Sequence, residues 1–262
     1  MKSINEFKKM QKSDSKISIV TCYDFWSAKI IDQSNVDAVL IGDSSVMVMH
    51  GFNSTANATI EMMELHVAAV CRGIKNKFVI ADLPFLAHRK GKKWLMSCVD
   101  RLIKAGANSI KIEGAGDNIK MISRVVNSGI PVMGHLGFTP QSINQIGGVI
   151  VQGKQEFASE KLVNDAKNLE KAGVFAIVLE LVPDILAEKI TKTISIPTIG
   201  IGAGNKTSGQ VLVLHDLLGM DNEFNPKFLK KYLDGFSLIT EALNKYNSDV
   251  KTKTFPSLKE SY

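Results

Sequence analysis

The sequence predicts an α/β protein folded as a (β/α)8 barrel, often called a TIM barrel. Short apolar or β-branched segments alternate eight times with longer amphipathic segments along the 262 residues, which is typical of this barrel. The short segments carry few polar residues, as expected for parallel strands that are buried on both faces. A doubly wound parallel sheet has the same alternation and stays open as the alternative fold.

The predicted elements follow one another without an internal repeat. The strands are expected at residues 17–22, 38–41, 78–81, 109–112, 131–133, 176–179, 198–200 and 211–214. Amphipathic helices are expected at residues 26–33, 60–72, 94–104, 119–127, 160–171, 184–191 and 227–243. This order gives one helix after nearly every strand, as the barrel requires.

Three further segments complete the predicted organisation. Ile4, Phe7 and Met10 have helical spacing, so residues 4–12 predict a short helix that closes the bottom of the barrel. Residues 137–157 form a long connection, which is often a lid or a binding loop. No linker divides the chain, and we expect a single domain over residues 1–262 with a polar C-terminal tail.

Composition limits the possible partners and locations. The chain has a net charge of +6, but its lysines form no dense run and its aromatic residues are few, which argues against nucleic-acid binding. Scattered lysines are usually a solvated surface, although they can also attract an anionic substrate. No apolar run approaches the roughly 18 residues needed to span a membrane. Cys22, Cys71 and Cys98 are odd in number and widely spaced, which predicts a reduced, cytoplasmic protein.

Carboxylate residues follow several predicted strands at the point where each strand ends. These residues are Asp43, Asp82, Glu113 and Glu180. Because the carboxyl ends of all strands meet at one rim of a barrel, we expect the four side chains to converge on one pocket. Clustered anions repel one another and are costly to desolvate, so they need a cation. Oxygen ligands suit Mg²⁺, and the pattern therefore predicts a magnesium-dependent site.

Each of these residues also has a simpler interpretation when it is taken alone. Asp43 and Asp82 could each cap the helix that follows, although Glu is a weak N-cap. Lys111 could extend to solvent or pair with one acid, and His135 could be structural. His215 also follows a predicted strand and is interpreted as structural. The occurrence of polar residues on successive strands, rather than any single residue, favours a functional site.

A dinucleotide site is disfavoured. The glycines of residues 200–204 lack the spacing of the dinucleotide-binding fingerprint, and no glycine-rich turn follows the first predicted strand. We interpret these glycines as positions where the backbone approaches a ligand or turns tightly.

Several stretches together resemble a known enzyme family. They are Thr-Cys-Tyr-Asp at 21–24, Ile-Gly-Asp-Ser at 41–44, Ala-Asp-Leu-Pro-Phe at 81–85, Lys-Ile-Glu-Gly at 111–114, Gly-His-Leu-Gly-Phe-Thr-Pro-Gln at 134–141, Gly-Ile-Gly-Ala-Gly at 200–204 and Gln-Val-Leu-Val-Leu-His-Asp at 210–216. In order and spacing over roughly residues 16–225, the sequence resembles the ketopantoate hydroxymethyltransferase family.

The resemblance implies a barrel of the phosphoenolpyruvate/pyruvate-binding type and a one-carbon transferase. The expected reaction transfers a hydroxymethyl group from 5,10-methylenetetrahydrofolate to 3-methyl-2-oxobutanoate, giving 2-dehydropantoate in pantothenate biosynthesis. The resemblance also implies Mg²⁺ held near Asp43, Asp82 and Glu113. Such enzymes often form homodecamers, so small-molecule substrates and copies of the same chain are the expected partners.

The remaining site roles are implied by the same resemblance. Substrate contacts are expected from Asp43, Ser44, Asp82, Lys111 and His135, and Glu180 matches the catalytic proton acceptor. His135 would lie near the hydroxyl group that forms in the reaction.

Other functions remain open on the sequence. A Mg²⁺-dependent lyase of the same superfamily, acting on a 2-oxo acid or a phosphonate, would use the same carboxylates without folate. An aldolase that forms a Schiff base through Lys111 would need an unprotonated amine, which neighbouring acids disfavour. A catalytically inactive barrel that serves as a binding scaffold would keep costly buried charges without using them.

Overall fold

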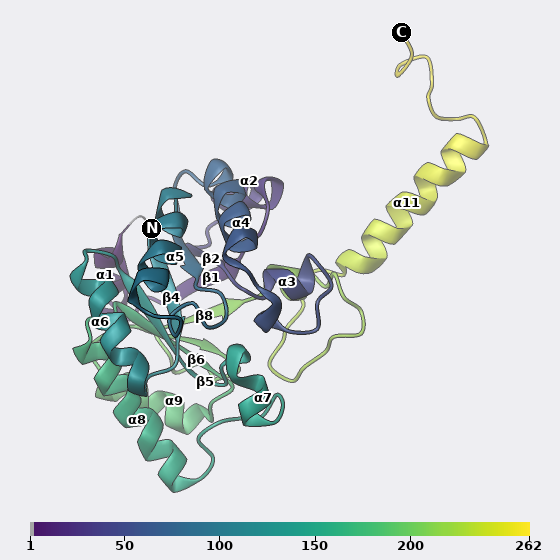
Figure 1. Ribbon diagram of the computed structural model, residues 1–262. Coiled ribbons are helices and arrows are strands. Elements are labelled where there is room, and N and C mark those ends of the chain that lie inside the picture. Colours follow the sequence, from purple (N-terminus) through teal and green to yellow (C-terminus); the bar gives the residue numbers. More distant parts are fainter. Residues whose placement is uncertain (1–2) are drawn as a thin grey trace. The chain divides into compact units, whose positions relative to one another are not determined.

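The protein contains a closed barrel of eight parallel strands, β1 to β8 in chain order, in a computed structural model that describes residues 3–262 (Figure 1). The strands are β1 (Ile17–Thr21), β2 (Ala38–Ile41), β3 (Phe78–Asp82), β4 (Ser109–Glu113), β5 (Val132–Gly137), β6 (Ala176–Glu180), β7 (Thr198–Ile201) and β8 (Gly209–Leu212). Because β1 pairs with β8, the sheet closes on itself. The predicted (β/α)8 barrel is confirmed, and the doubly wound sheet is excluded.

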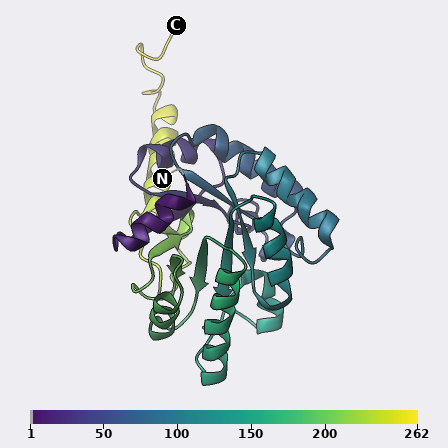
Figure 2. The ribbon, with the colours of Figure 1, turned by 90° about the vertical axis from the view of Figure 1, so that its left-hand side faces the viewer.

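The helices between the strands lie around the outside of the barrel (Figure 2). They are α2 (Phe25–Gln33), α3 (Ser45–Val48), α4 (Ile60–Gly73), α5 (Lys92–Lys104), α6 (Ile119–Asn127), α7 (Ile143–Ile146), α8 (Glu156–Lys171) and α9 (Asp184–Thr193). Three short 3-10 helices are η1 (Thr55–Asn57), η2 (Gly116–Asn118) and η3 (Pro140–Ser142). The long connection expected at residues 137–157 therefore contains η3 and α7.

The helix α1 (Ile4–Lys12) contributes to the core at the N-terminal ends of the strands, as the spacing of its apolar residues predicts. Phe7 is fully buried, and its ring centroid lies 5.5 Å from that of Phe78 and 5.2 Å from that of Phe175. Phe78 begins β3, and Phe175 directly precedes β6. The interior at this end is thus filled by apolar side chains, which leaves the opposite end for polar chemistry.

The predicted position of the last strand is wrong. Residues 211–214 were expected to form it, but β8 begins at Gly209, which pairs with Ile17 of β1 and Ile199 of β7. A Cβ atom at Gly209 would collide with the Ile17 carbonyl oxygen, so this strand starts where a residue without a side chain permits close approach. The apolar run alone could not reveal that start.

The chain consists of two compact units. The first ends at Leu212 and contains the barrel, and the second is Val213–Tyr262 with α10 (Leu214–Leu217) and α11 (Gly235–Lys251). The helix expected at residues 227–243 is thus placed too early, because Asp234 caps α11 through the Ser237 N–H at 3.3 Å. A single domain over 1–262, of which residues 1–2 lie outside the described residues, stays a prediction.

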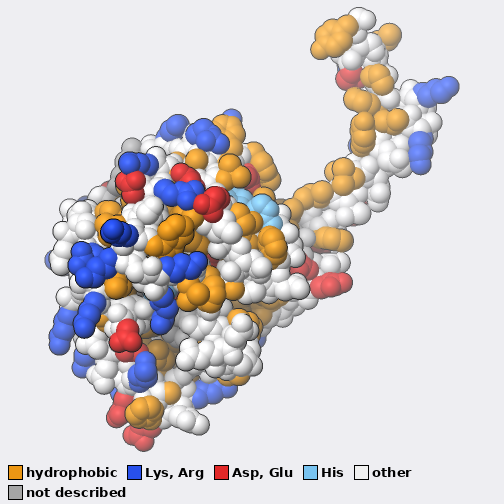
Figure 3. Space-filling view, in the orientation of Figure 1, with side chains coloured by type: hydrophobic (Ala, Val, Ile, Leu, Met, Phe, Trp, Pro, Cys, Tyr) orange, Lys and Arg blue, Asp and Glu red, His pale blue; other side chains and the backbone are white. Residues whose placement is uncertain are grey.

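One face of the barrel unit matches the interpretation of scattered charge (Figure 3). On the face of the barrel unit in Figure 3, Lys and Arg side chains are interspersed with acidic, apolar and uncharged ones. In residues 3–262, no helix combines the length and the apolar character that a membrane crossing needs.

Candidate active site

The predicted site residues lie toward the carboxyl ends of the barrel strands. Asp82, Glu113 and Glu180 are the last residues of β3, β4 and β6, and Asp43 follows β2. His135 lies within β5, opposite Glu113 in the strand register. Because the strands are parallel and the sheet is closed, these side chains share one mouth of the barrel.

Helix capping does not explain the two aspartates. The α-helices whose N-cap side chain accepts a hydrogen bond, among the described residues, start after Asp24, Thr59 and Asp234. Asp43 and Asp82 instead point into a shared cluster, in which the Asp43 N–H donates to Asp82 Oδ2 at 3.1 Å. Both carboxylates are nearly fully buried.

Lys111 supplies one positive charge to this cluster. Its Nζ lies 2.6 Å from Asp82 Oδ1, and the whole side chain is buried. Burial alone would lower the pKa of Lys111, but the charges of Asp82, Glu113 and Asp43 raise it above its usual range. The amine therefore stays protonated, which disfavours the Schiff-base alternative.

His135 lies between two carboxylates. Its Nδ1 is 3.2 Å from Glu113 Oε1, and its Nε2 is 3.2 Å from Glu180 Oε2. Burial opposes a positive charge on the imidazole, but the contacts with the carboxyl groups of Glu113 and Glu180 outweigh it and raise the pKa of His135 to about 9. Burial would likewise raise the pKa of Glu113, yet the contact with His135 holds it below its ordinary value. His135 is therefore positively charged at neutral pH and lies between the side chains of Glu113 and Glu180.

Asp43 is the least compensated acid of the site. Burial, followed by the charges of Asp82 and Glu113, raises the pKa of Asp43 well above its ordinary value. Lys111 and a hydrogen bond from Gln141 offset only part of this effect. A cation that binds beside Asp43 would therefore be stabilised.

The carboxylates of the site fit a Mg²⁺ ion that takes only part of its ligands from the protein. In residues 3–262 no group of three or more His, Cys, Asp or Glu side chains is already arranged around a common metal position. Mg²⁺ usually binds one or two protein carboxylates and takes its other ligands from water and substrate. The adjacent carboxylates of Asp43 and Asp82 match that number of protein ligands. Asp82 is already paired with Lys111, and the two Glu113 oxygens contact His135 and the Gln141 N–H.

Two residues of the site were assigned no role from the sequence. Gln141 donates from Nε2 to Asp43 Oδ2 at 2.8 Å, and the Tyr23 hydroxyl lies 2.8 Å from Ser44 Oγ. Both residues belong to stretches that carry the family resemblance, and this membership was the only sign in the sequence that they could belong to the site. Their partners lie far away in sequence, so pattern alone could not reveal these contacts.

His215 is not at the end of a strand. β8 ends at Leu212, and His215 lies in α10 of the second unit. Its predicted place after a strand is wrong because β8 begins and ends earlier than its apolar run suggests. The Asp216 that follows does not cap the helix, since Val213 is the N-cap residue of α10.

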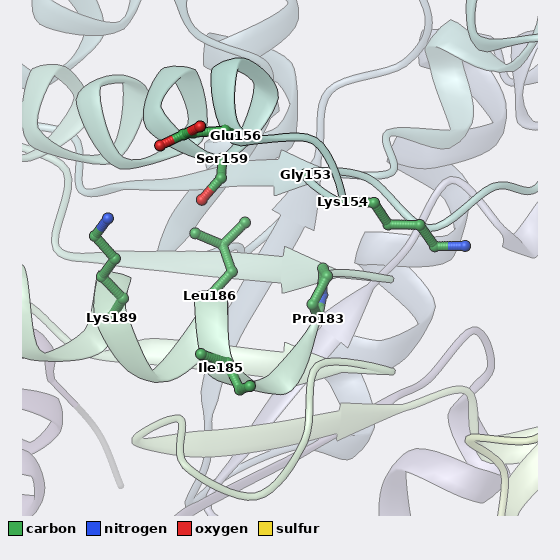
Figure 4. A pocket seen from close by; sticks show the side chains of 8 residues that line it. All are labelled: Gly153, Lys154, Glu156, Ser159, Pro183, Ile185, Leu186 and Lys189. Carbon is green, nitrogen blue, oxygen red and sulfur yellow. The ribbon is translucent and has the colours of Figure 1, made fainter.

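A hollow of about 500 Å³ lies outside the barrel mouth, between the N-terminal parts of α8 and α9 (Figure 4). Its lining comprises Gly153, Lys154, Glu156, Ser159, Pro183, Ile185, Leu186 and Lys189. It contains none of the buried acids described above.

Comparison with solved structures identifies the fold. Phosphonopyruvate hydrolase, solved as a complex with oxalate and Mg²⁺, matches with a TM-score of 0.64 and 12% identity over 99% of this chain and 93% of the other. A 2,3-dimethylmalate lyase of the PEP mutase/isocitrate lyase superfamily matches with a TM-score of 0.61 and 13% identity over 100% and 92%. At these identities the likeness concerns the fold alone.

The relatives found by sequence are far more similar to this chain than these structures are. A 3-methyl-2-oxobutanoate hydroxymethyltransferase of Coxiella burnetii (strain CbuK_Q154) is 58% identical over 254 residues, covering 97% of this chain and 96% of the relative. Enzymes of the same name from Bdellovibrio bacteriovorus and Francisella tularensis subsp. novicida are 52% and 48% identical over 100% of this chain and 100% and 99% of theirs. The family model described as ketopantoate hydroxymethyltransferase matches residues 1–258. The resemblance seen in the sequence is confirmed: the chain is an enzyme that belongs to the ketopantoate hydroxymethyltransferase family.

Proposed function

We propose that the protein transfers a hydroxymethyl group from 5,10-methylenetetrahydrofolate to 3-methyl-2-oxobutanoate, forming 2-dehydropantoate in pantothenate biosynthesis. The names of its relatives support the acceptor and the group transferred. The observation that carries the mechanism is the gathering of buried carboxylates, one lysine and one histidine at the carboxyl ends of β2 to β6. Deprotonation next to a ketone needs both a base and nearby positive charge, and this cluster contains groups for each.

Asp43 and Asp82 would hold Mg²⁺ directly, and Glu113 would complete the acidic surroundings of the ion. When bound, Mg²⁺ supplies positive charge that stabilises the negative charge developing on the keto oxygen of the substrate. Lys111, fixed by its ion pair with Asp82, adds a second positive charge at the same place. The Ser44 hydroxyl, held by Tyr23, is available to the substrate beside them.

Glu180 accepts the proton from C3 of the substrate. Its side chain is 19% exposed, whereas those of Asp82 and Glu113 are 3% and 6% exposed, so it is the most accessible of these acids. His135 contacts its Oε2, which leaves Oε1 to receive the proton. Glu113 fixes the other ring nitrogen of His135, so the imidazole keeps one orientation and holds Glu180 toward the mouth.

The test is an assay with purified protein, 3-methyl-2-oxobutanoate and methylenetetrahydrofolate, with and without Mg²⁺. The protein should form product only when 3-methyl-2-oxobutanoate, methylenetetrahydrofolate and Mg²⁺ are all present, and EDTA should abolish turnover. A lyase of the same superfamily would instead cleave a 2-oxo acid or a phosphonate without folate. Cleavage of those compounds together with no folate-dependent product would overturn the proposal.

A variant tests the metal ligands in the same assay. Asp82→Asn keeps the size of the side chain but removes one buried charge, so the Mg²⁺ concentration for half-maximal turnover should rise at least about tenfold. Asp100→Asn is the matched control, because Asp100 pairs with Lys104 on the exposed face of α5. Equal Mg²⁺ requirements in the two variants would contradict the assignment.

The homodecamer and the cytoplasmic location expected from the sequence stay predictions. We propose that the connection between β5 and α8, expected to be a lid or a binding loop, contributes to folate binding.

A further inference from the structure

The side chain of Gln141 joins two parts of the barrel mouth. Gln141 lies in η3, on the connection between β5 and α8, and its Nε2 donates to Asp43 Oδ2 at 2.8 Å and to the Leu83 carbonyl at 2.9 Å. Its backbone N–H donates to Glu113 Oε2 at 3.1 Å. One residue thus contacts the segments that follow β2 and β3 and the last residue of β4.

The chemistry of the neighbours fixes the orientation of the amide. Both partners of Nε2 are acceptors, so the NH₂ group and not the amide oxygen must face them. Both of its N–H bonds are then used, one on a buried carboxylate and one on a main-chain carbonyl. A charge-assisted hydrogen bond of this kind is stronger than a neutral one and holds the carboxylate in one rotation.

Asp43 is held by one oxygen only. Oδ2 accepts from Gln141, whereas no donor within residues 3–262 hydrogen-bonds Oδ1. The carboxylate is therefore fixed through one oxygen and retains the other for a further ligand.

We propose that Gln141 is a positioning residue for the divalent cation: it holds Asp43 by Oδ2 so that Oδ1 is the oxygen that binds the ion. The inference rests on the proposed Mg²⁺ site at Asp43 and Asp82. It also links the connection after β5 to that site, because the same residue belongs to both. Metal affinity should then depend on a side chain that does not itself bind the metal.

The decisive variant is Gln141→Met, which keeps the length of the side chain and the backbone N–H to Glu113 but removes both amide donors. Gln152→Met is its matched control on the same connection. Within the described part of the chain, the Gln152 side chain donates only to the Ile150 carbonyl, and its backbone N–H donates to the Leu181 carbonyl. Binding of Mn²⁺ to each metal-free protein is measured by electron paramagnetic resonance without substrate. Thermal unfolding in EDTA reports whether each variant remains folded.

Gln141→Met should weaken Mn²⁺ binding by about 10-fold to 100-fold relative to both wild type and Gln152→Met. Excess Mg²⁺ should restore its turnover, since only the placement of the ion is impaired. If Gln141 merely tethers the connection, its loss lowers the unfolding temperature but leaves Mn²⁺ affinity within about twofold of the control, which overturns the inference. If the wild type binds Mn²⁺ no better than Asp82→Asn, the proposed site fails and the inference fails with it.

Discussion

At the scale of one residue, Asp43 is a buried acid whose ionisation is unfavourable in the metal-free protein. Its carboxylate is buried beside Asp82 and Glu113, so ionisation is opposed by desolvation first and by like charges second. Such a residue destabilises the metal-free protein in its ionised form. A divalent cation bound beside Asp43 would favour the ionised form, and metal binding is therefore a reason for this residue to be present.

The variant Asp43→Asn should therefore stabilise the metal-free protein. Because folding raises the pKa of Asp43 above its ordinary value of 3.8, the folded state binds more protons than the unfolded state above that pH. The wild type thus loses stability relative to the variant as the pH rises through the folded pKa. Calorimetry in EDTA at pH 8 should give the variant an unfolding temperature at least about 2–4 °C above that of the wild type. Near pH 4 the difference between the two proteins should be smaller.

Addition of Mg²⁺ provides the control for that experiment. The ion should raise the unfolding temperature of the wild type and much less that of Asp43→Asn, since only a ligand bound to the folded state stabilises it. A variant that is less stable than the wild type at pH 8 in EDTA would refute this account of Asp43.

Sequence patterns revealed some site residues and not others for a clear reason. Asp82, Glu113 and Glu180 each end a strand, so their position could be predicted from the alternation of apolar segments. Gln141 lies in a connection, and its contact with Asp43 spans 98 positions in the sequence. Such a contact depends on where the connection crosses the barrel mouth, which no local pattern encodes.

At the scale of one element, α1 closes the core at the end opposite the acids. The Phe7 ring packs edge-on against Phe78 and Phe175, and the whole side chain is buried. Helical spacing of apolar residues was enough to predict this helix. The start of α11 was predicted less well, because the Asp234 cap determines it more than the apolar pattern does.

Phe7→Ala should lower the free energy of unfolding by about 3–5 kcal/mol, since the cavity cannot be refilled between two fixed rings. Phe157→Ala is a matched control, as Phe157 is 81% exposed at the start of α8. Urea denaturation should show little change for the control. Equal losses in the two variants would mean that α1 does not contribute to the core as described.

At the scale of the whole molecule, closure of a parallel sheet explains why acids far apart in sequence meet. The eight strands run in one direction and in chain order, so their carboxyl ends form one rim. The alternation of apolar and amphipathic segments predicted this topology and the rim. Val213–Tyr262 form a second compact unit, and the single domain expected over residues 1–262 stays a prediction.

The central claim is that this rim removes the C3 proton of the substrate through Glu180. Exchange of that proton for deuterium, followed by nuclear magnetic resonance in D₂O with Mg²⁺ and without folate, isolates the step. Glu180→Gln keeps the shape of the side chain, and Glu188→Gln, whose partner Lys192 lies on the exposed face of α9, is the control. The account predicts Mg²⁺-dependent exchange in wild type and control, and a loss of about 10²- to 10⁴-fold in Glu180→Gln with Mg²⁺ affinity retained. Exchange at the wild-type rate in Glu180→Gln would contradict it.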